Sequence, residues 1–158
     1  GSAGAQQVEE LFAHKHWKVS GVAWDDGTMG CVAEVSAPGE SFSIWTLQDG
    51  SVSLQFYSTA WSFGEGDTAD LEVQIDRRAP WSLTGAELYQ NSVLFYLPDD
   101  RSGVNFVGEV ARGNRLYLRD DDGSDVQNYS LAGSSASIQA LIDCGDVIAK
   151  RTPGNPFN

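Results

Sequence analysis

Residues 51–56 have the sequence Ser-Val-Ser-Leu-Gln-Phe, in which polar and apolar side chains alternate at every position. Residues 70–75, Asp-Leu-Glu-Val-Gln-Ile, repeat this alternation. Because successive side chains of a strand point to opposite faces, a period of two places the apolar side chains of each stretch on one face. Both stretches therefore predict strands of a half-buried sheet.

Further strands are predicted where short apolar runs lie between turn sequences. The glycines of Asp25-Asp26-Gly27-Thr28 and Gln48-Asp49-Gly50 favour hairpin turns, because glycine adopts a positive φ at little cost. The spacing of these runs predicts a mainly β fold, an antiparallel meander closed into a β-sandwich or barrel-like sheet. The additional candidate strands are Trp17–Ala23, Cys31–Val35, Phe42–Leu47, Val93–Leu97 and Val126–Leu131, with Leu116 and Leu118 on one more.

The C-terminal third is predicted to contain one or two short helices. Ser102 is a candidate N-cap for a helix that runs to about Arg112, with Gly113 as the residue that ends it. A second helix is predicted from about Ala136 to Cys144, capped by a hydroxyl of Gly133-Ser134-Ser135.

Length and charge limit the organisation and the partners. The chain has 158 residues and a formal net charge of -12, which predicts one domain with an acidic surface that repels nucleic acid. Residues 15–149 are predicted to form the single β-rich domain, between an N-terminal arm (1–14) and a flexible C-terminal tail (150–158). Within the arm, Gly1-Ser2 is typical of a tag scar and Ala3-Gly4-Ala5 of a signal-cleavage remnant.

The two cysteines, Cys31 and Cys144, favour an exported protein in which they form a disulfide. Two buried free thiols in a cytosolic protein are the alternative. A disulfide would agree with a periplasmic or secreted location and would leave no thiolate for catalysis.

Four motifs together resemble the invasion-associated locus B family of small exported alphaproteobacterial proteins. They are Trp17-Lys18-Val19, Gly30-Cys31-Val32-Ala33, the segment Ile75–Trp81, and residues 131–136 before the last helix. The family tends to have a cysteine just after the first Trp-x-Val, where this chain has Ser20 and Gly21. The resemblance implies a periplasmic or secreted accessory protein and carries over no active-site residue.

Aromatic residues in two predicted loops, Ser58–Ala69 and Arg77–Leu83, are the candidate binding residues. An exposed tryptophan near arginine is typical of a protein-interaction hot spot. The alternative is that these rings fold back and cover the ends of the β-core. The candidates are Trp61, Phe63, Arg77, Arg78 and Trp81.

Metal and catalytic motifs are weak. His14 and His16 would share one face of a strand but lack evident further ligands, so a solvated segment is expected. The acidic stretch around Asp120, Asp122 and Asp125 does not have the EF-hand spacing and predicts a hairpin tip. No Gly-x-Ser-x-Gly motif occurs, and we expect no enzyme activity, metal or cofactor.

The function predicted from these features is that of a non-catalytic exported accessory protein, which binds another macromolecule of the envelope or extracellular space through its aromatic loops. Two alternatives stay open. One is a carbohydrate-binding module for envelope glycans, and the other is an inhibitor or immunity protein for a hydrolase.

Overall fold

The computed structural model describes residues 6–150 and contains one antiparallel sheet with two helices. The mainly β prediction with helices late in the chain is confirmed. The elements, in chain order, are β1 (Gln6–His14), β2 (Trp17–Trp24), β3 (Met29–Ala37), β4 (Glu40–Leu47), β5 (Val52–Ser58), β6 (Phe63–Ile75), β7 (Trp81–Gln90), β8 (Ser92–Tyr96), α1 (Asp100–Arg112), β9 (Arg115–Asp120), β10 (Asp125–Ser130) and α2 (Ser134–Ala149).

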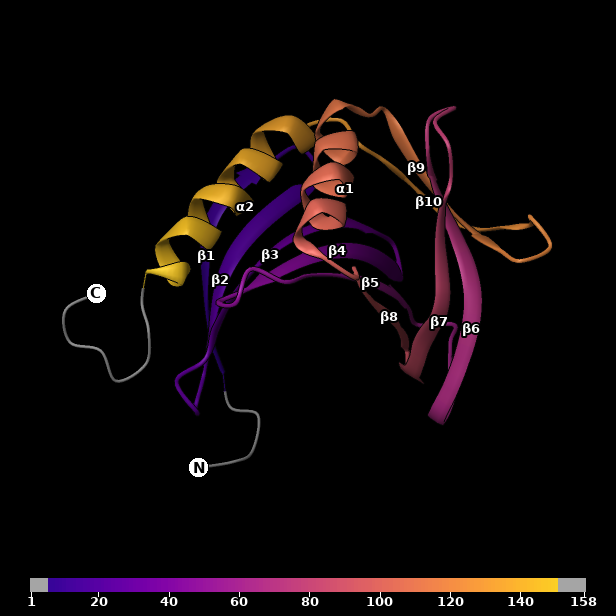
Figure 1. Ribbon diagram of the computed structural model, residues 1–158, viewed down its shortest axis with the longest axis horizontal. Helices are drawn as coiled ribbons and strands as arrows, with labels where there is room; N and C mark the ends of the chain where they lie inside the picture. The colour runs from indigo at the N-terminus through magenta and orange to yellow at the C-terminus, as the bar shows by residue number, and fades with distance from the viewer. Residues whose placement is uncertain (1–5, 151–158) are drawn as a thin grey trace.

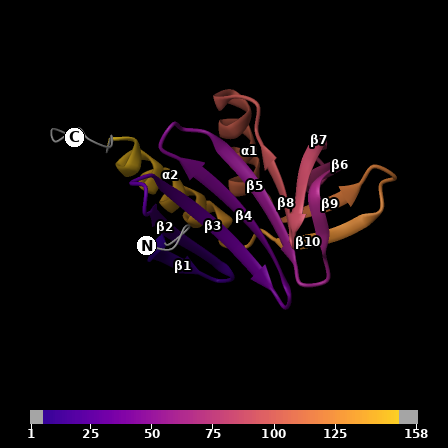
Figure 2. The same ribbon diagram turned by 90° about the horizontal axis from the view of Figure 1, so that it is seen from below.

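The ten strands follow the order β1-β2-β3-β4-β5-β8-β7-β6-β9-β10. The predicted meander is correct for β1 to β5 and again for β6 to β8. The two parts do not join in sequence order, because β5 pairs with β8. The sheet is strongly curved and both helices lie on one of its faces (Figure 1). Seen from below that view, β3, β4 and β5 lie in front of the helices (Figure 2).

The core lies between the helices and the sheet face that they cover. Phe42 of β4 and Phe56 of β5 are fully buried there, with ring centroids 4.8 Å apart. Phe106 of α1 and Leu141 of α2 pack into the same cluster. The apolar residues of the alternating sequences therefore form the sheet face that the helices cover, and the residues between them form the opposite face.

The β9–β10 hairpin bends back toward strands that are distant in the sheet order. The Gln127 side chain donates a hydrogen bond to the Tyr57 carbonyl oxygen at 3.0 Å, and the Tyr129 ring lies 6.2 Å from Phe42. These contacts join β10 to β4 and β5, so the curved sheet is partly closed as a barrel would be.

The disulfide between Cys31 and Cys144 is present, and the free-thiol alternative is wrong. It ties α2 to β3, with the two Cα atoms 6.1 Å apart. The bond joins residues separated by 113 positions, so it constrains most of the domain in the unfolded chain.

The caps of α1 differ from the prediction. Asp99, not Ser102, is the N-cap, since its carboxylate accepts a hydrogen bond from the Ser102 amide at 2.7 Å. Gly113 ends the helix as predicted, but with an extended φ of -87°. A glycine is needed at this position because there is no room for a side chain. A Cβ there would lie 2.5 Å from a methyl of Ile75.

Helix α2 is longer than predicted and its serines have another role. It continues past Cys144 to Ala149, and Gly133 is its N-cap without a side-chain hydrogen bond. The Ser134 hydroxyl donates instead to the Val110 carbonyl oxygen at 2.7 Å, which links α2 to α1.

Both predicted functional loops are shorter than expected. Strand β6 begins at Phe63 and β7 at Trp81, so most of 58–69 and the end of 77–83 belong to strands. Residues 6–14, predicted as an arm, form β1 and pair with β2. The predicted tag scar, cleavage remnant and residues 151–158 of the tail lie outside the described residues.

Candidate binding surface

The predicted binding residues do not form one site. Trp61 and Phe63 contact each other at the start of β6, with ring centroids 5.6 Å apart, and both are half-buried against the core. Trp81 lies opposite Val73, near the other end of β6. A 13-residue strand is about 40 Å long at ~3.3 Å per residue, so the two groups are far apart.

Trp81 mainly holds α1 against β7. Its ring packs edge-on against Phe106 at 5.4 Å, and its indole nitrogen donates a hydrogen bond to Glu109 at 3.2 Å. Arg77 and Arg78 are exposed in the adjacent turn. The open alternative, that these rings cover the β-core, therefore describes Trp81 well.

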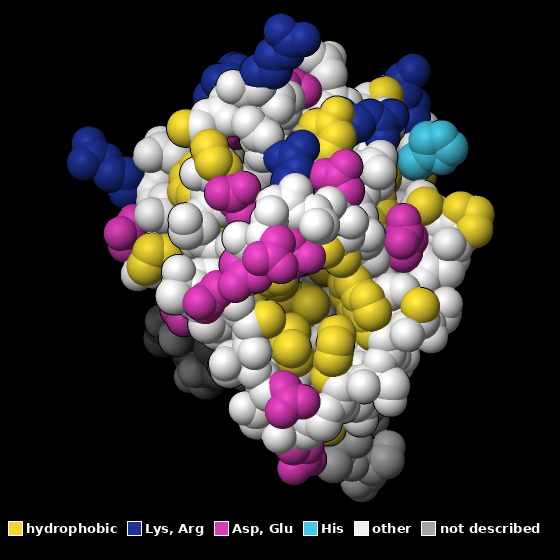
Figure 3. Space-filling view, turned by 90° about the vertical axis from the view of Figure 1, so that its right-hand side faces the viewer, with side chains coloured by type: hydrophobic (Ala, Val, Ile, Leu, Met, Phe, Trp, Pro, Cys, Tyr) yellow, Lys and Arg dark blue, Asp and Glu magenta, His cyan; other side chains and the backbone are white. Residues whose placement is uncertain are grey.

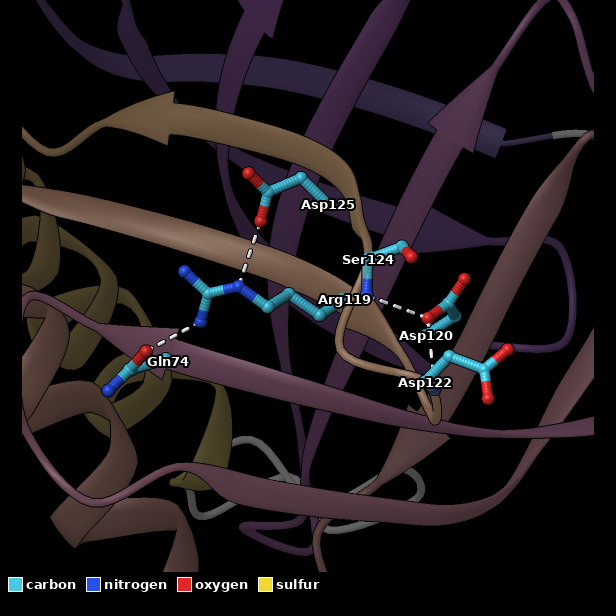
Figure 4. Close-up of polar contacts among 6 residues, drawn as sticks. All are labelled: Gln74, Arg119, Asp120, Asp122, Ser124 and Asp125. Carbon is cyan, nitrogen blue, oxygen red and sulfur yellow. Dashed lines mark hydrogen bonds and ion pairs between the residues drawn. The ribbon is translucent and has the colours of Figure 1, made fainter.

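The acidic hairpin tip shapes its own turn (Figure 4). One Asp120 oxygen accepts hydrogen bonds from the amides of Asp122 and Ser124, at 3.0 and 2.9 Å. Asp125 forms an ion pair with Arg119 at 2.8 Å. Asp120, Asp121 and Asp122 are close enough to share an ion, but these contacts already explain the turn.

The two histidines flank the β1–β2 turn. His14 is the last residue of β1 and His16 lies in the turn, so they do not share one strand face. Both are exposed, as expected for a solvated segment.

Five partly exposed aromatic side chains lie on the sheet face opposite the helices. Directly paired residues of antiparallel strands share a face, and the register Trp45↔Ser53↔Tyr96 and Tyr57↔Ser92↔Tyr89 therefore places these aromatics together. We call this surface the helix-free face. The five aromatic residues on β2, β4, β5, β7 and β8 are Trp24, Trp45, Tyr57, Tyr89 and Tyr96, and Tyr117 of β9 lies on the same face.

A hollow of about 470 Å³ lies on the helix-free face over β3, β4 and β5. Trp45 and Tyr57 provide its aromatic lining, and Glu34 and Glu40 are its charged residues. We call it the Glu34 hollow. Its volume is in the range of small-ligand sites and suits one side chain or a sugar unit.

Hydrogen bonds hold the side chains of the Glu34 hollow in place. The Trp45 indole nitrogen donates to the Gln55 side-chain oxygen at 3.0 Å, and the Gln55 amide nitrogen donates to Ser92 at 3.0 Å. The two Glu34 oxygens accept from the Ser36 and Ser43 hydroxyls at 3.1 and 3.4 Å. The lining is thus ordered before any ligand binds.

A second hollow of about 510 Å³ lies beside the first, lined by Trp24, Asp26, Leu47 and Asp49 among others. The Trp24 and Trp45 rings are 6.0 Å apart and connect the two hollows. Hydrogen bonds from the Thr28 hydroxyl and amide lower the pKa of Asp26, and those from Ser51 lower the pKa of Asp49. Both carboxylates therefore stay charged in mild acid.

Carboxylates dominate the charges around these hollows. Within residues 6–150, ion-pair distance is reached only between Arg119 and Asp125, so Glu34 has no ion-pair partner there. Lys18 lies directly opposite Glu34 on β2 but beyond that distance. Figure 3 shows the side of the molecule that lies on the right in Figure 1, where Asp and Glu also border a hollow lined by hydrophobic side chains and several Lys and Arg lie near the top.

Trp45 and Tyr57 were not among the residues singled out from the sequence. Their positions in the alternating sequences could have identified them. Trp45 lies two residues after Ser43, and Tyr57 lies two residues after Gln55, so each aromatic shares a strand face with a polar residue. A large aromatic residue at such a position lies on the face that the core does not cover.

Comparison of the chain with family models, curated proteins and solved structures finds no match. The resemblance to the invasion-associated locus B family therefore stays a prediction. Among the described residues, neither helix has the length and apolarity needed to cross a membrane.

Proposed function

We propose that this protein is a non-catalytic exported accessory protein that binds another macromolecule with its helix-free face. The observation that carries the proposal is the set of five aromatic side chains on strands β2 to β7, around two ordered hollows. Tryptophan and tyrosine are enriched in protein interfaces and supply much of their binding energy. This face replaces the predicted loops as the proposed contact surface.

The disulfide supports the exported location in the proposal. Bonds such as Cys31–Cys144 persist in oxidising compartments and are rare in the cytosol. A periplasmic or secreted protein is also what the resemblance to the invasion-associated locus B family implies.

A glycan is the second candidate ligand. Aromatic rings next to carboxylate and amide groups also occur where proteins bind sugars. The Glu34 hollow has such groups in Trp45, Tyr57 and Gln55. Glycan binding would use the same face, so it is tested with the same variants.

The experiment is crosslinking capture from the native cell envelope, followed by purification of the captured molecule and measurement of its Kd. The variants are Trp45→Ala/Tyr57→Ala on the helix-free face, Trp61→Ala at the loop predicted from sequence, and Val104→Ala, an exposed apolar residue of α1, as the control. We expect the double variant to lose at least ~10-fold in affinity, because interface aromatics contribute ~1–2 kcal/mol or more each.

The control should bind as the wild type does. An unchanged Kd in the double variant would overturn the proposed surface, and a loss confined to Trp61→Ala would return the site to the loop. A captured glycan in place of a protein would favour the second candidate.

A further inference from the structure

We propose that the Glu34 hollow receives a cationic side chain, of arginine or lysine, from a basic segment of the partner protein. The inference rests on the proposed function and specifies the chemistry of the partner. It is drawn from the charges and rings that line the hollow and from the hydrogen bonds that are already formed inside it.

The residues that line the hollow include carboxylates and aromatic rings but no lysine, arginine or histidine. Glu34 supplies the carboxylate on this face, and Trp45 and Tyr57 the rings; Glu40 borders the hollow, but its strand phase is that of Phe42 on the covered face. A carboxylate attracts a cation directly, and an aromatic ring attracts it through the negative face of its π-system. Both kinds of group therefore favour the same ligand chemistry.

Several neutral polar groups of the hollow are engaged within the protein. Gln55 accepts a hydrogen bond from Trp45 and donates one to Ser92, so its side chain is committed at both ends. The Trp45 N–H is used in the same network, which leaves its ring surface for a ligand. The Glu34 charge is therefore the feature of this hollow that distinguishes a cationic ligand from a neutral sugar.

Glu34 keeps acceptor capacity in a fixed orientation. Each of its oxygens accepts one serine hydroxyl, and a carboxylate offers about four acceptor positions in total. A guanidinium or ammonium group can therefore add hydrogen bonds without displacing Ser36 or Ser43.

The wider surface agrees with a basic partner. The chain carries a formal net charge of -12, and the adjoining hollow adds Asp26 and Asp49 beside Trp24. An acidic patch of this kind attracts a basic segment and repels an acidic one. Lys18, opposite Glu34, is the positive charge that opposes this attraction.

The test uses two small probes of the same shape that differ in charge, together with a neutral sugar. Acetyl-arginine amide is titrated into the labelled protein beside acetyl-citrulline amide, its uncharged isostere, and a neutral trisaccharide of N-acetylglucosamine. The readout is the NMR chemical shift of the Trp45 indole N–H and of the Glu34 and Ser43 amides. We expect the arginine probe to shift these signals saturably and to bind at least ~5-fold more tightly than citrulline.

Two variants should change this affinity in opposite directions. Glu34→Gln removes the attracting charge and should weaken the arginine probe by ~5-fold, whereas Lys18→Gln removes the opposing charge and should strengthen it by ~2-fold. Asp121→Asn, at the distant hairpin tip, is the control with the same change in net charge as Glu34→Gln and should have no effect. A variant that merely disturbed the sheet would not produce this pattern of signs.

Equal binding of arginine and citrulline, or an unchanged affinity in Glu34→Gln, would overturn the inference. Stronger shifts with the trisaccharide than with arginine would overturn it in favour of a glycan. If the arginine probe fails while Trp45→Ala/Tyr57→Ala still loses the captured partner, the cationic chemistry is wrong and the proposed binding face stands.

Discussion

The two faces of strands β4 and β5 have opposite roles although they share one backbone. On the covered face, Phe42 and Phe56 are fully buried and stack on each other. On the helix-free face, Trp45 and Tyr57 belong to the same two strands but stay partly exposed beside polar neighbours. The comparison teaches that the phase of the strand decides whether an aromatic residue is buried in the core or stays accessible for contact with a partner.

The largest expected effect concerns the bond that fixes the covered face. Replacing both Cys31 and Cys144 with serine should lower the free energy of unfolding by about 4–5 kcal/mol, because the closed loop is long. Denaturant unfolding measures the change. A reducing agent should lower the unfolding free energy of the wild type and leave that of the double variant unchanged. An unchanged value for the wild type under reducing conditions would contradict this account.

Adjacent residues 56 and 57 sharpen the comparison between the faces. Phe56→Ala opens a cavity in the core and should cost about 3–5 kcal/mol of unfolding free energy. Tyr57→Ala removes a side chain that is 36% exposed and should cost under ~1 kcal/mol. Urea unfolding of both variants tests the difference, and similar losses would mean that the helix-free face is also structural.

Gly113 tests how tightly α1 is seated on the covered face. An added Cβ would lie 2.5 Å from Ile75 and 2.8 Å from Leu131, so Gly113→Ala should cost about 1–3 kcal/mol by overpacking. Gly108→Ala, in the same helix beside the movable Arg112 side chain, is the matched control. Thermal unfolding of the pair measures the effect, and an equally mild result for both would contradict the close contact.

The smallest expected effect is a pH dependence at the closure of the barrel. Burial, assisted by the Glu40 charge, raises the pKa of Tyr129 above its ordinary value of 10.0. The unfolded chain therefore loses this proton near pH 10 while the folded chain keeps it, so stability should fall as the pH rises above about 10. The melting temperature from pH 8 to 11 should decline less in Tyr129→Phe than in wild type, and an equal decline in both proteins would contradict this account.

Much of the fold could be predicted because its signals are local. Residues 52–56 and 70–75 lie within β5 and β6, and the helix that ends at Arg112 was placed correctly at its C-terminal end. The N-cap of that helix was missed because Asp99 and Ser102 are both good capping residues, and only backbone geometry distinguishes them. The candidate site was missed because exposure was assigned to loops, whereas the exposed aromatics lie on strands.

By itself, the sequence determined the alternation of the strands, the acidic surface and the two cysteines that could pair. Only the tertiary structure decided that β5 pairs with β8, which face the helices cover, and that Trp61 and Trp81 lie near opposite ends of β6. The physical reason is the separation along the chain between the residues that interact. Alternation arises between neighbouring residues, whereas strand order and burial of a face arise from contacts between segments far apart in the chain.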